Sequence, residues 1–123
     1  MSESGLFCQV NRVKDPNKKE PLEQKHLAVI EVPSEIKSEQ FFNLKIKVGE
    51  IDHPNENGHF IQWIELYVGD VYLGRFDLAP VMTKPEVTIP LSIAHGNRKT
   101  VLRAVSRCNL HGMWESTKAI EVR

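Results

Sequence analysis

The sequence predicts an all-β protein, a seven-stranded antiparallel β-sandwich of immunoglobulin-like type that follows an irregular N-terminal arm. Seven short segments rich in β-branched and aromatic residues support this prediction, because turn-forming residues separate them over about 100 residues. No segment keeps the roughly 3.6-residue period of a helix over several turns. A chain of 123 residues suits one core of this size, so we expect residues 1–123 to form a single domain.

The arm is expected over residues 1–21, which are polar and are interrupted by Pro16 and Pro21. Short strands with turn residues between them then fill the rest of the chain. The seven predicted strands are Leu27–Val32, Phe41–Val48, Phe60–Val68, Val71–Phe76, Glu86–Ile93, Thr100–Arg107 and Met113–Val122.

A two-residue period assigns side chains to the two faces of these strands. Apolar and polar residues alternate over residues 42–48, as they do in a half-buried strand. In the third strand, the same count places Ile61 and Trp63 on one face and Ile64 and Leu66 on the other. A Gly-Asp pair after this strand predicts a tight hairpin turn to the fourth.

Charge and hydropathy exclude several classes of protein. Sixteen Lys and Arg balance 16 Asp and Glu, so we expect neither a nucleic-acid nor a membrane partner. No apolar run approaches the roughly 18 residues of a membrane span, and the N-terminus lacks the layout of a signal peptide. We therefore expect a cytoplasmic protein with reduced thiols, and a disulfide between Cys8 and Cys108 is the less favoured alternative.

Histidine and cysteine residues gather at the expected strand ends and loops. His26 precedes the first strand, His53 and His59 bracket a turn-forming segment, and Cys108 and His111 lie between the last two strands. Loops held by a rigid sandwich are where binding sites are commonly built. Taken singly, these residues fit solvated loop histidines and a buried thiol beside a surface imidazole. Their joint occurrence favours a metal site.

The number and type of these donors narrow the choice of metal. Structural zinc usually takes four ligands with more sulfur, and blue copper takes two histidines and a cysteine. The oxygenase type of iron site uses two histidines and a carboxylate, without a thiolate. Four neutral imidazoles and one thiolate would form a square pyramid with one open face. With ferrous iron, that set carries a single net positive charge, which suits an anionic one-electron substrate.

Three motifs in order carry a resemblance to a known family. They are Lys25–Ile30, the His53-x5-His59 pair leading into Trp63–Tyr67, and Cys108–Trp114, which reads Cys-Asn-x-His-Gly-x-Trp. Together they resemble superoxide reductase, and within it the one-iron class, neelaredoxin, from about residue 22 to the C-terminus. This class is related to the C-terminal domain of desulfoferrodoxin, whose N-terminal domain has four cysteines. Only Cys8 lies in that region here, so a second iron centre is not expected.

The resemblance implies both a ligand set and a reaction. His26, His53, His59 and His111 would be the equatorial ligands of one mononuclear iron, cycling between Fe2+ and Fe3+, and Cys108 the axial ligand. Superoxide would bind opposite the sulfur, take one electron and two protons, and leave as hydrogen peroxide without producing dioxygen. Backbone N–H groups of the turn after the cysteine are expected to hydrogen-bond to the sulfur.

The resemblance also implies a catalytic lysine, Lys25, whose ammonium would attract superoxide, with an ordinary surface lysine as the alternative. The family usually has a glutamate before that lysine, which binds the sixth position of the resting ferric iron. Here Gln24 takes that place, with Glu23 one step earlier. If this segment is extended, Gln24 shares the side of His26 and Glu23 points away. Gln24 is then the candidate for the sixth position, as a poorer ligand that the reaction does not need.

The resemblance further implies superoxide as substrate, an electron donor such as rubredoxin or a similar small carrier, and a homo-oligomer, commonly a tetramer. Two other functions stay open: an electron-transfer or metal-storage protein with the same ligands, and a metal-free adhesion or interaction module. Cys8 and His95 match no motif, and we expect a small apolar side chain in the arm and a turn residue, respectively.

Overall fold

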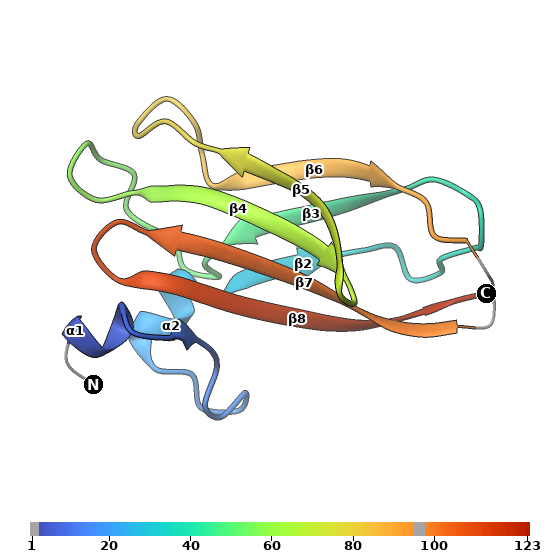
Figure 1. Ribbon diagram of the computed structural model, residues 1–123, viewed down its shortest axis with the longest axis horizontal. Helices are drawn as coiled ribbons and strands as arrows, with labels where there is room; N and C mark the ends of the chain where they lie inside the picture. Colours follow the sequence, from blue (N-terminus) through green and yellow to red (C-terminus); the bar gives the residue numbers. More distant parts are fainter. Residues whose placement is uncertain (1–2, 95–97) are drawn as a thin grey trace.

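Two β-sheets face each other in the structure, a computed structural model that describes residues 3–94 and 98–123 (Figure 1). The larger sheet has the strand order β1-β8-β7-β4-β5 and the smaller sheet the order β2-β3-β6. This is the immunoglobulin-like sandwich that the sequence predicts. The strands are β1 (Val10–Asn11), β2 (Ala28–Glu31), β3 (Phe42–Val48), β4 (Ile61–Val68), β5 (Val71–Asp77), β6 (Glu86–Leu91), β7 (Arg98–Cys108) and β8 (Gly112–Val122).

All seven predicted strands are present, with small differences at their ends. They pair in antiparallel fashion, and β4 turns directly into β5, with Val68 opposite Val71 across the predicted Gly-Asp turn. The main core lies between the sheets, where Leu44 of β3 and Ile64 of β4 are fully buried. None of the helices within residues 3–94 and 98–123 is long and apolar enough to cross a membrane.

The N-terminal arm is more regular than predicted. It contains a short helix α1 (Glu3–Leu6) and the two-residue strand β1, and it ends in a second helix, α2 (Pro21–His26). Strand β1 pairs in parallel with β8, so the larger sheet gains a fifth strand, the eighth of the sandwich, and is no longer purely antiparallel. The sequence prediction fails here because two residues carry no periodicity, and six span less than two helical turns.

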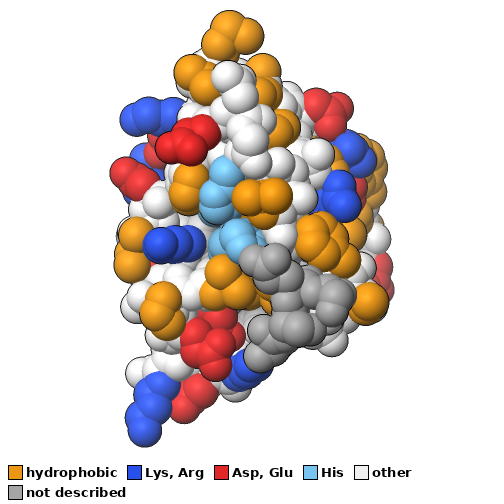
Figure 2. Space-filling model, turned by 90° about the vertical axis from the view of Figure 1, so that its left-hand side faces the viewer, with side chains coloured by type: hydrophobic (Ala, Val, Ile, Leu, Met, Phe, Trp, Pro, Cys, Tyr) orange, Lys and Arg blue, Asp and Glu red, His pale blue; other side chains and the backbone are white. Residues whose placement is uncertain are grey.

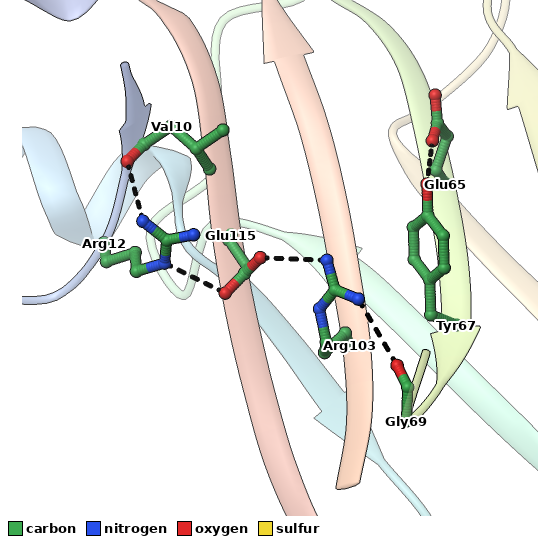
Figure 3. Close-up of polar contacts among 7 residues, drawn as sticks. All are labelled: Val10, Arg12, Glu65, Tyr67, Gly69, Arg103 and Glu115. Atoms are coloured by element: carbon green, nitrogen blue, oxygen red, sulfur yellow. Dashed lines mark hydrogen bonds and ion pairs between the residues drawn. The ribbon is translucent and has the colours of Figure 1, made fainter. Parts of the chain in front are cut away.

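A polar network fastens this arm to the larger sheet (Figure 3). The Glu115 carboxylate accepts from Arg12 Nε at 3.0 Å and from Arg103 Nη2 at 3.2 Å. Arg103 also donates to the Gly69 carbonyl at 3.3 Å and lies 4.6 Å from the centre of the Tyr67 ring. Burial alone would raise the pKa of Glu115, but the two guanidinium groups outweigh it and hold that pKa below its ordinary value. The network thus connects the end of β1 with β8, β7 and β4.

A β-bulge near the start of β4 corrects the predicted faces of this strand. The register between β4 and β7 shifts between Ile61 and Trp63. Ile61 therefore joins Ile64 in the main core, whereas Trp63 lies outside it, with the Arg75 guanidinium 4.6 Å from its ring. The prediction that Ile61 and Trp63 share a face is wrong, because the two-residue count fails across a bulge. Ile61 pairs with Cys108, so the irregularity lies beside a candidate ligand.

Candidate metal centre

One end of the sandwich carries all five residues singled out as metal ligands. His26 is the last residue of α2, and His53 and His59 lie in the loop between β3 and β4. Cys108 ends β7, and His111 lies in the turn to β8. Figure 1 shows α2, this loop and this turn together at the same end of the molecule. His95, which was expected in a turn, lies outside the described residues.

The donor atoms of these five residues converge. The ligand atoms of His26, His59, Cys108 and His111 all lie within 4.8 Å of one another. His53 joins them, because its Nε2 lies 3.2 Å from Nε2 of His26 and its ring centre 4.8 Å from that of His59. The structure therefore brings together the complete predicted set.

Backbone carbonyls orient two of the imidazoles toward the centre. His26 Nδ1 lies 2.7 Å from the Leu22 carbonyl, and His53 Nδ1 lies 2.6 Å from the Pro54 carbonyl. A carbonyl oxygen only accepts hydrogen bonds, so each Nδ1 carries the proton and each neutral ring keeps its lone pair on Nε2. The two Nε2 atoms lie 3.2 Å apart, so their lone pairs face each other. This arrangement is unfavourable by itself and is well suited to a shared cation.

His59 and His111 complete the imidazole set. His59 Nε2 is buried and has no hydrogen-bond partner among the described residues, which is costly for a polar atom without a ligand. Burial, followed by the nearby charge of His111, lowers the pKa of His59. His111 directs its Nδ1 to within 3.6 Å of the Cys108 sulfur. The donor arrangement thus fits a metal ion on structural grounds.

Cys108 supplies the sulfur at this centre. Its side chain is fully buried, and burial raises the pKa of its thiol. Hydrogen bonds from the backbone of Leu110 and His111 act in the opposite direction, as predicted for the turn after the cysteine. A bound cation would favour the thiolate despite its burial. No disulfide joins Cys108 to Cys8, which is exposed rather than packed as an apolar side chain.

Two imidazoles stay neutral well below physiological pH. Burial is the main cause that lowers the pKa of both His26 and His53 to about 4. The charges of neighbouring histidines lower both values further, while each carbonyl hydrogen bond acts in the opposite direction. Both rings are therefore available as metal ligands without first losing a proton.

We expect acid to destabilise the metal-free protein between pH 7 and pH 5. In the unfolded chain both imidazoles bind protons near pH 6.5, whereas folded His26 and His53 resist protonation down to about pH 4. The two neutral rings therefore contribute their full share to the free energy of unfolding above pH 6.5, and this share falls as the pH drops toward 4. Each ring should contribute about 1–2 kcal/mol, because water at the rim of the site reduces the full effect. Urea unfolding at the two pH values measures it.

The variant His53→Gln provides the control for this acid effect. It should lose about half of the change in unfolding free energy between the two pH values, because one of the two titrating rings is gone. Equal unfolding free energies of the wild-type metal-free protein at pH 7 and pH 5 would contradict the assignment.

Trp114 supports the centre through contacts with His26 and His111, a role that the sequence did not predict. Its ring stacks on His26 with centres 4.9 Å apart and an interplanar angle of 20°. Its indole N–H donates to the His111 carbonyl at 3.0 Å. Trp114 also packs with Leu6 and Leu27 in a small second core between the arm and β8. In the sequence, only its place in the Cys-Asn-x-His-Gly-x-Trp motif pointed to a role at the centre.

The backbone around Gln24 is helical, which corrects the expected extended segment. Residues two apart in a helix point in nearly opposite directions, so Gln24 no longer shares the side of His26 by that argument. The Glu23 carboxylate is buried, and it accepts from the backbone N–H groups of Glu20 at 2.9 Å and Lys14 at 3.0 Å. Glu23 therefore stabilises the start of α2 and its approach. The argument from alternation for Gln24 is therefore lost, and its place before Lys25 in the motif stays as the reason to consider it for the sixth position.

The centre reaches the surface on one side. His26 and His53 are buried, whereas His59 and His111 are partly exposed. Figure 2 shows histidine side chains at the surface of this end, bordered by hydrophobic side chains and a basic one. Lys25 is exposed, and its charge contributes to the lowered pKa values of His53 and His59. A small anion thus has access to a rim that includes this ammonium group.

Comparison with known proteins places this centre in a family. Residues 18–117 match the desulfoferrodoxin family model. A protein of Methanocaldococcus jannaschii is 44% identical over 115 residues, covering 93% of this chain and 95% of its own. Neelaredoxin of Megalodesulfovibrio gigas is 34% identical over 119 residues, covering 81% of this chain and 89% of its own. The solved superoxide reductase (neelaredoxin) from Ignicoccus hospitalis covers both chains completely, with 36% identity and a TM-score of 0.78. The chain belongs to the desulfoferrodoxin family.

Proposed function

We propose that this protein is a superoxide reductase that converts superoxide to hydrogen peroxide with one electron and two protons. The observation that carries the proposal is the convergence of four imidazoles and one thiol at the surface-reaching end of the sandwich. Relatives named superoxide reductase and neelaredoxin, with the same overall fold, support it. A single iron bound there would supply the transferred electron by changing between its ferrous and ferric states.

The ligands that we propose for this iron are His26, His53, His59, His111 and Cys108. The carbonyl hydrogen bonds fix two of the imidazoles in the tautomer that presents Nε2. The backbone hydrogen bonds to the sulfur limit how strongly the thiolate donates its electrons. We include neither Gln24 nor Glu23 in this set.

Lys25 is the proposed catalytic residue that attracts superoxide. Its side chain is exposed at the end of α2, next to His26, and its positive charge acts on two rings of the centre. An ammonium group at the rim raises the local concentration of a small anion and stabilises negative charge on it. An electron carrier or a metal-storage protein needs no such ammonium group. A metal-free module would not explain why the Nε2 lone pairs of His26 and His53 face each other.

We expect Lys25→Gln to slow the reaction with superoxide about 10-fold, because electrostatic attraction is lost. The rate should also depend less steeply on ionic strength, since screening acts on the charge that was removed. Stopped-flow mixing at several salt concentrations measures both effects. Lys118→Gln removes the same charge at an exposed position of β8, and this variant should react like the wild type. Equal rates for the two variants would assign Lys25 to the ordinary surface.

Turnover needs an external electron donor, because each reaction consumes one electron. We propose a small carrier such as rubredoxin for this role, a homotetramer as the assembly, and the cytoplasm as the compartment that keeps Cys108 reduced. Anaerobic reduction of the ferric protein by rubredoxin tests the first of these proposals, and sedimentation of the iron-loaded protein tests the second.

Colour and rapid mixing together test the proposed function. A ferric centre with a thiolate ligand should be blue after oxidation and lose its colour on reduction. Anaerobic ferrous protein mixed with superoxide should oxidise rapidly and release one hydrogen peroxide per iron, without dioxygen. Iron binding without this rapid oxidation would favour the carrier or storage function. A protein that holds no iron would favour the metal-free module.

A further inference from the structure

A single side chain joins the two loops that carry most of the proposed ligands. Asn109 follows Cys108 in the β7–β8 turn, and its amide reaches the β3–β4 loop on both sides of His59. Its Oδ1 accepts from the Phe60 N–H at 2.9 Å, and its Nδ2 donates to the Gly58 carbonyl at 3.0 Å. One amide group therefore holds both neighbours of a ligand, from the position next to another ligand.

The backbone adds a third hydrogen bond to this clamp. The Asn109 N–H donates to the Phe60 carbonyl at 3.2 Å. These bonds lie next to the bulge in β4, where the register with β7 shifts between Ile61 and Trp63. Regular strand pairing is interrupted there, so the side chain of Asn109 supplies contacts that the β-ladder does not.

We propose that Asn109 is a positioning residue that sets the distance between the Cys108 sulfur and the His59 imidazole. The inference rests on the proposed iron centre. Among the described residues no hydrogen bond at His59 Nε2 holds the ring, so its place depends on its contacts with His53 and His111 and on the backbone that carries it. Asn109 fixes that backbone on both sides, and it does so from the turn whose N–H groups reach the sulfur. Loss of such an outer contact commonly weakens metal binding about 10–100-fold.

Asn55 offers a matched control within the same β3–β4 loop. Its Oδ1 accepts from the Val81 N–H at 2.8 Å, and its Nδ2 donates to the Thr83 carbonyl at 3.2 Å. It too clamps the loop to another segment through both ends of its amide. That segment carries no proposed ligand, so Asn55→Ala removes similar hydrogen bonds and leaves the connection between Cys108 and His59 intact.

The test measures iron release from the full-length, iron-loaded protein into excess bipyridine under anaerobic conditions. Asn109→Ala should release iron about 10–100-fold faster than the wild type, and its blue ferric band should shift in wavelength. Asn55→Ala should keep the wild-type release rate and band. Thermal unfolding of the metal-free proteins should show comparable losses for both variants, which separates positioning from general stability.

Equal release rates for Asn109→Ala and Asn55→Ala would overturn the proposal. Should Asn109→Ala not fold, Asn109→Asp keeps the acceptor for Phe60, replaces the donor to Gly58 by a second acceptor that faces the Gly58 carbonyl oxygen, and adds a negative charge. Its iron release should still be faster than that of the wild type, because the hydrogen bond to Gly58 is lost, and a wild-type rate would overturn the proposal. A wild-type protein that retains no iron would instead contradict the proposed function, so the two failures are distinguishable.

Discussion

Replacing Cys108 with serine should abolish the blue colour of the ferric protein and its rapid reaction with superoxide. The buried thiol is the sulfur donor of the donor cluster, and a serine hydroxyl does not ionise near neutral pH. Loss of a group that merely orients a ligand costs about 10–100-fold, so loss of the ligand should lower the rate more than about 100-fold. The visible spectrum and stopped-flow oxidation by superoxide measure the two effects.

Two features make this substitution a clean test. The serine oxygen fits the volume of the sulfur and accepts hydrogen bonds from Leu110 and His111, so the fold should survive. Cys8→Ser changes the other, exposed cysteine and should keep both colour and rate. A blue band that persists in Cys108→Ser would show that the sulfur assignment is wrong, whatever its activity.

Much of the fold could be predicted because the strands carry a regular pattern. Residues 42–48 alternate as one strand should, and the core residues of β3, together with Ile64 and Leu66 of β4, follow from such alternation. The arm could not be predicted in the same way. Strand β1 is two residues long and forms because it pairs with β8, which is a contact between distant parts of the chain. The Ile61–Trp63 bulge likewise depends on pairing with β7, and no local pattern reveals it.

The candidate ligands could be named from the sequence because a metal centre restricts residue type and spacing. The supporting contacts could not, since most of them are backbone groups. The carbonyls of Leu22 and Pro54 orient two imidazoles, and any residue type could have provided them. The expectation of an extended backbone around Gln24 is wrong for a different reason. A six-residue helix is too short to show a period, and Glu23 supports its start through distant Lys14 as well as nearby Glu20.

Gly112→Ala should destabilise the protein by about 2–5 kcal/mol, because it combines a strained backbone with a steric clash. Gly112 has a φ of +78°, which an L-residue adopts only at a cost. A Cβ there would lie 2.4 Å from the Leu6 carbonyl oxygen. That oxygen cannot easily move, because Asn11 Nδ2 donates to it at 3.0 Å and to the Met113 carbonyl at 2.8 Å. Urea unfolding of the metal-free protein measures the loss.

The damage should extend to the metal centre, because the arm packs on Trp114. Leu6 and Trp114 share the second small core, and Trp114 stacks on His26. A displaced arm should therefore change the fluorescence of Trp114 and accelerate iron release. Gly58→Ala is the matched control, since a Cβ at this exposed glycine would meet nothing within 4 Å. Equal unfolding free energies for Gly112→Ala and Gly58→Ala would show that the close contact between Gly112 and Leu6 does not hold the arm in place. The proposed support of the metal centre by the arm would then be wrong.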